Sequence, residues 1–205
     1  MSLEAVSRRV LAAFKGARTS PMLLRALSHP LTGSEIEDAC SAMFGPNSVW
    51  VGAYDTLADE LAREVAAGGD MRSWLAARPA AAAIVLYRWT ENYGHWFTVF
   101  LGARGKIEFF DSTGHAPDTL QRLQTPQQAA QLGQLHRWMI QALRRRTAYY
   151  SAQKLQSSNS EVCGRWCLLR LYLRRLSDTQ FARFVHRLAR ITGATPDMVA
   201  AAATI

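Results

Sequence analysis

The chain has 205 residues, of which 49% are hydrophobic and 20% are charged. This composition is typical of a globular protein that buries a core, and it excludes an intrinsically disordered chain. No apolar run approaches the ~18 residues needed to span a bilayer, and the first residues lack the hydrophobic stretch of a secretory signal. We therefore expect a protein that has no membrane partner and is not secreted.

The formal charge of +8 is distributed unevenly. Residues 1–120 carry 11 Lys and Arg against 13 Asp and Glu, a charge of −2, whereas residues 121–205 carry 13 against 3, a charge of +10. A basic half of this kind is typical of proteins that bind a polyanion such as nucleic acid, although solvated arginine-bearing helix faces give the same pattern. The candidate nucleic-acid contacts are Arg144, Arg145, Arg146, Arg174 and Arg175.

The first element is predicted at residues 3–17, where apolar residues recur at helical spacing and basic residues occupy the other side. Pro21, Pro30 and Gly33 punctuate the polar stretch that follows, and no regular element is predicted there. We expect residues 1–30 to form a helical N-terminal extension.

The next elements are two helices with an extended piece between them. Ser34 and Glu37 form an S-x-x-E capping box, which predicts a short helix that ends near Phe44. Residues 49–53 are expected to be extended, and residues 57–67 are expected to be helical.

Three strands are predicted next, at residues 81–89, 95–101 and 106–110. These runs are rich in β-branched and aromatic residues, and short turn-like segments separate them. Their short connections favour an antiparallel meander. A further strand is expected within residues 147–155.

The second half of the chain is predicted to be mainly helical. Residues 127–146 form a long helical stretch, and residues 162–176 are apolar on most sides, which is typical of a buried helix. Ser177 and Thr195 are expected to cap two closing helices. The predicted fold class is α+β, with a central mixed or antiparallel sheet flanked by helices.

The segment of residues 156–167 contains two of the three cysteines. Ser160 is a candidate N-cap, which places Cys163 in the first helical turn, where the helix dipole stabilises a thiolate. Gly164 leaves room for a substrate backbone. Because most free cysteines are small buried hydrophobic residues, that interpretation of Cys163 stays open. An odd number of cysteines without paired CxxC motifs argues against a disulfide framework or zinc ribbon, and we expect no metal or organic cofactor.

Catalysis by a thiolate requires a base, a group that orients the base, and donors for the oxyanion. His95 begins one predicted strand and Asp111 follows the next. The start of one strand and the end of its antiparallel neighbour lie at the same edge, so these side chains are expected to meet. Gln156 precedes Cys163 by seven residues, and its amide is expected to donate to the oxyanion beside the Cys163 N–H.

These motifs resemble those of a known family. The pattern Gln-x-x-Asn-Ser-x-x-Cys-Gly-x-Trp-Cys of residues 156–167 is similar to the cysteine motif of the adenovirus-type endopeptidases (adenain). Gly94-His95-Trp96 resembles their His-Trp segment, and residues 109–114 resemble their acid-and-turn segment. The resemblance covers about residues 31–176. It implies a protease domain over residues 31–205, with the nucleophile at the N-terminus of a buried helix, as in the wider ubiquitin-like-protease class.

Two departures limit what the resemblance carries over. The acid, Asp111, is Glu in human adenovirus enzymes. Their activating peptide forms a disulfide with a cysteine between the acid and the nucleophile, and no cysteine lies between Asp111 and Cys163. The resemblance therefore implies DNA as a candidate activator but does not carry over that covalent link.

The expected function is a cysteine endopeptidase. The resemblance implies a monomer that cleaves viral precursor proteins of the capsid or core during particle maturation. It would act in the virion and the host cell interior, with the nucleus as one candidate compartment. Three alternatives stay open: a protease that removes ubiquitin-like modifiers, an acetyltransferase with the same His-acid-Gln-Cys site, and a non-enzymatic nucleic-acid-binding protein.

Overall fold

A five-stranded mixed sheet forms the centre of the protein. The computed structural model describes residues 2–15, 20–90, 93–102, 105–117, 119 and 148–205. The strands follow the order β1 (Val49–Ala53), β2 (Ala82–Thr90), β3 (Tyr93–Leu101), β4 (Ile107–Phe110) and β5 (Ala148–Tyr150). The expected antiparallel meander of β2, β3 and β4 is confirmed, while β1 pairs in parallel with β2 and β5 pairs in parallel with β4.

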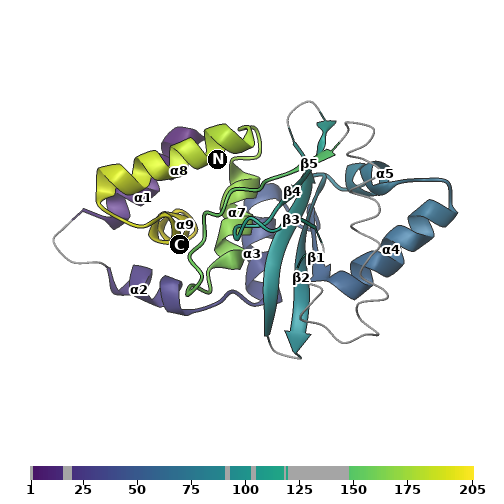
Figure 1. Ribbon diagram of the computed structural model, residues 1–205, viewed down its shortest axis with the longest axis horizontal. Helices are drawn as coiled ribbons and strands as arrows, with labels where there is room; N and C mark the ends of the chain where they lie inside the picture. Colours follow the sequence, from purple (N-terminus) through teal and green to yellow (C-terminus); the bar gives the residue numbers. More distant parts are fainter. Residues whose placement is uncertain (1, 16–19, 91–92, 103–104, 118, 120–147) are drawn as a thin grey trace.

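Helices cover both faces of this sheet (Figure 1). The described helices are α1 (Leu3–Ala13), α2 (Pro21–Ser28), α3 (Gly33–Phe44), α4 (Tyr54–Ala66), α5 (Met71–Ala76), α7 (Cys163–Tyr172), α8 (Asp178–Thr192) and α9 (Pro196–Ala203). α4 and α5 lie against one face. α7 and α3 lie against the other, and α1, α2, α8 and α9 form a further helical layer behind α7. The predicted α+β class is therefore confirmed.

Alternating side chains of the strands pack into two separate cores. Ile84 of β2 and Phe100 of β3 belong to the core on the α7 side. Their neighbours Val85 and Val99 belong to the core beneath α4 and α5. Because successive side chains of a strand point to opposite faces, the strands are apolar on both sides, and this explains why they are nearly continuous hydrophobic runs in the sequence.

α7 is buried along almost its whole length, as predicted. It carries a charged residue into the core: Arg170 is fully buried and forms an ion pair with the fully buried Glu108 of β4. The Tyr149 hydroxyl donates a hydrogen bond to the same carboxylate. Burial raises the pKa of Glu108, although the Arg170 charge opposes that shift. Arg170 therefore ties α7 to the sheet and contributes nothing to the basic surface.

The N-terminal region differs from the prediction in two places. The polar stretch after α1 contains α2, in which Pro21 occupies the first turn and the Ser20 hydroxyl accepts a hydrogen bond from the Met22 N–H. A proline suits this position because its missing N–H would have no helical partner. The capping box of α3 is Thr32 with Glu35, two residues earlier than expected.

Other predictions in the helical regions had mixed outcomes. Ser177 and Thr195 cap α8 and α9 as expected. α5, a six-residue helix, was not predicted. The long helix expected over residues 127–146 lies outside the described residues.

α1 and α2 contribute to the core that surrounds α7. Val6 and Leu23 are fully buried in the same cluster as α9, and α9 contacts both helices. The boundary between an N-terminal extension and a domain of residues 31–205 stays a prediction. In the described segments, no helix is both long enough and apolar enough to cross a membrane.

Candidate active site

His95 and Asp111 meet near the start of β3 and the end of β4, as the antiparallel pairing of the two strands predicted. Thr98 of β3 pairs with Phe110 of β4 in antiparallel register, so the residues before Thr98 run alongside those after Phe110. The Nε2 of His95 lies 2.8 Å from Oδ1 of Asp111, and both side chains are buried. This contact makes the carboxylate the group that orients the imidazole.

The Asp111 carboxylate is held by further donors. The backbone N–H of Thr113 donates to Oδ1 over 2.8 Å, and the Thr113 hydroxyl donates to the same oxygen over 2.6 Å. Burial raises the pKa of Asp111, but the bonds from His95 and Thr113 outweigh it, so the pKa is lowered overall. The acid is therefore ionised, and its position is fixed from two sides.

Cys163 is the first residue of α7. The helix has its N-cap at Val162, without a side-chain cap bond, so the expected capping role of Ser160 is wrong. Cys163 and His95 line the same cleft, and Cys163 is close enough to His95 to contribute to the raised pKa of the imidazole. The imidazole therefore interacts with both a carboxylate and a thiol.

The electrostatics of His95 favour its charged form. Burial lowers the pKa of His95, but the hydrogen bonds and charges of Asp111 and Cys163 raise it to about 10. The site therefore favours an imidazolium beside the sulfur at neutral pH, which is the state that a cysteine nucleophile requires.

Gln156 lies in the loop before α7, with its side-chain amide held at both ends. The Ser112 hydroxyl donates to its Oε1 over 2.6 Å, and its Nε2 donates to the Ser160 carbonyl over 2.7 Å. Gln153, three residues earlier in the chain, instead donates to Oδ2 of Asp178 over 3.2 Å. Gln156 is therefore the glutamine that lies at this site.

Cys163, His95 and Gln156 line one cleft of about 350 Å³. The segment of residues 30–33 forms another part of its wall, and the Trp96 indole N–H donates to the Leu31 carbonyl of that segment over 3.1 Å. A cleft of this size fits a few residues of an extended peptide beside the sulfur.

Gly164 has a different role from the one expected. A Cβ added at Gly164 would lie 3.1 Å from Ile36, 3.2 Å from Leu31 and 3.5 Å from Trp96. The missing side chain therefore lets α3 and the cleft wall pack closely against α7, and it does not make room for a substrate backbone.

The three cysteines lie in different environments. All are free and buried. Burial raises the pKa of the Cys40 thiol to about 12, and burial also raises the pKa of Cys167 strongly. Both thiols are held in the neutral form, so Cys163, the cysteine that lines the cleft beside His95, is the candidate nucleophile.

The structure describes two of the five candidate nucleic-acid contacts, Arg174 and Arg175. Residues 144–146 lie outside the described residues. Arg174 donates a hydrogen bond to the Ala80 carbonyl, and its guanidinium lies 5.5 Å from the centroid of the Phe44 ring. Arg175 is exposed. Arg174 is thus engaged within the protein, and its role towards nucleic acid stays a prediction.

Three residues near the site were not singled out from the sequence. Ser112 and Thr113 directly follow the acid, and their hydroxyls bond to Gln156 and Asp111. Asp197 of α9 accepts hydrogen bonds from the Ser157 N–H and from an indole of α7. The short polar run after the acid was a usable signal for Ser112 and Thr113, whereas nothing local indicated Asp197. Within the described ranges, no group of three or more His, Cys, Asp or Glu side chains could hold a metal ion.

Comparison with known proteins relates the chain to a viral protein. It is similar to the uncharacterized protein V9 of Sputnik virophage, with 30% identity over 131 residues, which make up 62% of this chain and 75% of the virophage protein. No model of a known protein family matches the chain. The similarity therefore points to a viral relationship without naming an activity.

Proposed function

This chain belongs to the same family as protein V9 of Sputnik virophage, and we propose that it is a cysteine endopeptidase of the adenain class. The observation that carries the proposal is the His95 imidazole, which is hydrogen-bonded to the Asp111 carboxylate and lines the same cleft as the Cys163 sulfur. The resemblance of the cysteine motif and the chain order of histidine, acid, glutamine and cysteine support the same activity.

In the first half of the reaction, the Cys163 thiolate attacks the carbonyl carbon of the scissile bond. A sulfur–carbon bond forms, and the carbonyl electron pair moves to the oxygen. One Nε2 hydrogen of Gln156 is bonded to Ser160, so the second is available for this oxyanion together with the Cys163 N–H, which has no partner within its helix. The His95 imidazolium then gives its proton to the leaving amine as the carbon–nitrogen bond breaks.

In the second half, water releases the acyl group. Neutral His95 takes a proton from the water, whose oxygen attacks the thioester carbon, and the sulfur leaves as a thiolate. Asp111 remains ionised throughout and stabilises the imidazolium each time it forms. The proposed substrates are viral precursor proteins cut during particle maturation in the virion or the infected cell, in keeping with a viral relative.

The test is cleavage of a peptide library by the wild-type chain, by Cys163→Ala and by Cys40→Ala. Cys163→Ala is expected to lose cleavage completely, while Cys40→Ala, which removes another buried thiol, keeps it. Iodoacetamide should also label Cys163 faster than the other two thiols at neutral pH. A folded wild-type chain that cleaves no peptide would refute the endopeptidase. Selective reaction with a ubiquitin-based probe, or acetyl transfer from acetyl-CoA, would favour one of the alternative activities.

We further propose that the outer face of α8 binds the phosphate backbone of nucleic acid. Arg183, Arg187 and Arg190 follow one another at spacings of four and three residues, His186 directly precedes Arg187, and all four are exposed. Within the described part of the chain, none of the three arginines forms an ion pair. Residues at this spacing share one helix face, so their charges form a single stripe.

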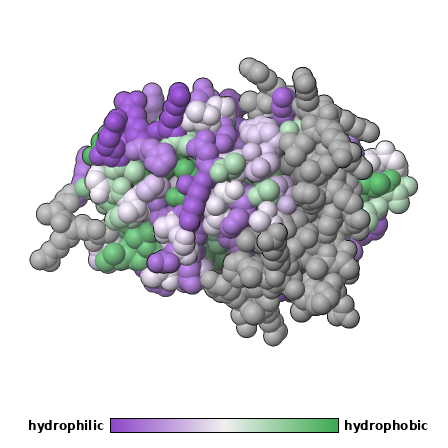
Figure 2. Space-filling model, viewed as in Figure 1, coloured by the Kyte–Doolittle hydropathy of each residue, from purple (hydrophilic) through white to green (hydrophobic). Residues whose placement is uncertain are grey.

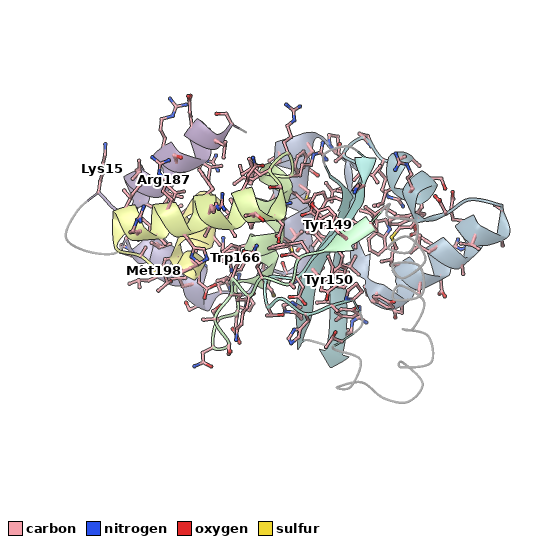
Figure 3. All side chains as sticks on the ribbon, turned by 45° about the horizontal axis from the view of Figure 1, so that its top comes forward. Lys15, Tyr149, Tyr150, Trp166, Arg187 and Met198 are labelled. Atoms are coloured by element: carbon pink, nitrogen blue, oxygen red, sulfur yellow. The ribbon has the colours of Figure 1, made fainter. Side chains whose placement is uncertain are left out.

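The neighbouring helix adds positive charge at the same end of the molecule. Arg8 and Arg9 of α1 and Lys15 just after it are exposed, and α1 contacts α8. Figure 2 shows hydrophilic side chains gathered over these helices, and Figure 3 places Lys15 and Arg187 at the helical end, away from the sheet. Phosphate contacts carry no base information, so binding is expected to be independent of sequence.

The salt dependence of DNA binding tests this surface. Each lost contact lowers the slope of log K against log salt by ~0.9 for duplex DNA. Replacing Arg183, Arg187 and Arg190 with glutamine is therefore expected to flatten the slope by ~2–3, whereas Arg63→Gln on α4 leaves it unchanged. An unchanged slope in the triple variant would refute a binding role for α8.

A further inference from the structure

Ser112 directly follows the proposed acid, and it contacts a different part of the site. Its side chain is almost fully buried, and its hydroxyl donates to Oε1 of Gln156 over 2.6 Å. We propose that Ser112 is a positioning residue that fixes the amide of Gln156 with its N–H groups directed towards the oxyanion. This assignment rests on the proposed endopeptidase activity.

The two partners of the amide define its orientation. The Ser160 carbonyl can only accept a hydrogen bond, so the amide atom 2.7 Å away from it must be the nitrogen. The oxygen then faces Ser112, whose hydroxyl can donate. A flipped amide would place its oxygen against the Ser160 carbonyl oxygen, which is repulsive. The network therefore allows one orientation, in which the nitrogen side carries the free hydrogen.

The backbone of Gln156 is held independently of the Ser112 hydroxyl. The carbonyl of Ser112 accepts the N–H of Leu155 over 2.8 Å and the N–H of Gln156 over 2.9 Å. On the other side, the Ser157 N–H donates to Asp197 over 3.1 Å. The loop is therefore anchored by main-chain bonds on both sides of Gln156. Removal of the Ser112 hydroxyl frees the side-chain amide while these anchors remain.

Two consecutive residues thus support two different catalytic tasks. Asp111 supports proton transfer through His95, and Ser112 supports stabilisation of the oxyanion through Gln156. Both residues follow the end of β4, which the sheet holds rigidly in place. The end of one strand therefore sets the relative position of the base and the oxyanion donor.

Loss of the Ser112 hydroxyl should affect turnover more than substrate binding. The terminal torsion of a glutamine side chain is broad, so an amide without its anchor samples several orientations. The donor is then present for only part of the time when the oxyanion forms. Removing such a donor completely costs ~10²–10³ in kcat, so Ser112→Ala is expected to lower kcat by about tenfold or more within that limit. KM should change little, because the oxyanion exists only in the transition state.

The experiment is a double-mutant cycle on a peptide that the wild-type chain cleaves. Ser112→Ala lowers kcat in the wild-type background, but in the Gln156→Ala background it is expected to change kcat by no more than about twofold. Ser112→Thr keeps the hydroxyl and should restore kcat. The matched control is Ser151→Ala, since Ser151 is a fully buried serine next to β5 whose hydroxyl is hydrogen-bonded to the Gln153 N–H, while the Gln156 amide bonds to Ser112 and Ser160.

A second measurement separates positioning from general damage to the fold. Alkylation of Cys163 by iodoacetamide forms no oxyanion, so its rate in Ser112→Ala should match that of the wild type. If alanine unfolds the chain, Ser112→Cys supplies the same comparison, because a thiol is a weaker donor and should give an intermediate kcat.

Two kinds of failure can be told apart. Wild-type kcat in Ser112→Ala, or an equal loss of kcat in both backgrounds, overturns the positioning role while leaving the endopeptidase intact. A folded wild-type chain without cleavage refutes the endopeptidase, and the positioning role falls with it.

Discussion

Replacing Asp111 with asparagine removes the negative charge that lies 2.8 Å from Nε2 of His95 while keeping the shape of the side chain. Burial alone would lower the pKa of His95, and the partners Asp111 and Cys163 raise it to about 10. An opposite charge at this separation typically shifts a pKa by ~1–3. Asp111→Asn is therefore expected to lower the His95 pKa by about that amount, equivalent to ~1.4–4 kcal/mol.

The sign of the linked stability change follows from the same shift. The pKa of His95 is higher in the folded chain than its ordinary value of 6.5, so protonation stabilises the fold. That contribution is complete below pH 6.5 and is lost as the pH rises towards about 10. In Asp111→Asn, the loss of stability over this window should be smaller by ~1.4–4 kcal/mol.

NMR titration of the labelled His95 imidazole measures the pKa directly in the wild type and in Asp111→Asn. Denaturant unfolding across the same pH window measures the linked stability. The alkaline limb of the kcat/KM profile should also move to lower pH, because it reports the protonation of His95 in the free enzyme. An identical His95 pKa in both proteins would refute the argument that the carboxylate holds the imidazolium.

Three further predictions concern the supporting residues. Gln156→Ala should lower kcat by ~10²–10³ through loss of an oxyanion donor, as measured by peptide cleavage. Glu108→Gln leaves the Arg170 charge buried without its partner, and denaturant unfolding should show a loss of ~3–5 kcal/mol. Trp96→Phe removes the hydrogen bond to Leu31 in the cleft wall, so unfolding should show a loss of ~1 kcal/mol, together with a higher KM.

A different result would contradict each of these predictions. Wild-type kcat in Gln156→Ala would leave the Cys163 N–H as the sole donor. The loss in Glu108→Gln should be partly recovered by adding Arg170→Met, since the unpaired charge is then absent. No recovery would mean that Glu108 stabilises the sheet independently of Arg170. An unchanged KM in Trp96→Phe would mean that the wall does not contact substrate.

Much of the sheet could be predicted from the sequence because its signals are local. The strands β2, β3 and β4 are runs of β-branched and aromatic residues between turn-forming residues, so the pattern defines both their extent and their antiparallel pairing. That pairing also predicted the meeting of His95 and Asp111, which the 2.8 Å contact confirms. Cys163 lies in the first turn of α7, as expected, although the helix begins later than a cap at Ser160 would give. The catalytic roles of these residues remain proposals.

Sequence patterns gave the wrong prediction where the same residues fit two different local structures. Thr32-x-x-Glu35 and Ser34-x-x-Glu37 both match a capping box, and the sequence cannot rank them. In the structure, the Trp96 indole holds the Leu31 carbonyl, which fixes the chain just before Thr32 and favours the earlier box. Pro21 was similarly ambiguous, since a proline can interrupt a helix or begin one.

The sequence by itself determined the strands, the buried helix and the cysteine, histidine and acid candidates, because periodicity, turn residues and motif spacing are properties of neighbouring residues. Only the tertiary structure decided which distant groups meet. The hydroxyl of Ser112 reaches Gln156 from 44 residues away, and Asp197 reaches the same loop from 40 residues away. Such contacts depend on how β4, α7 and α9 pack together, and buried polar groups take whichever partner that packing brings within hydrogen-bond distance.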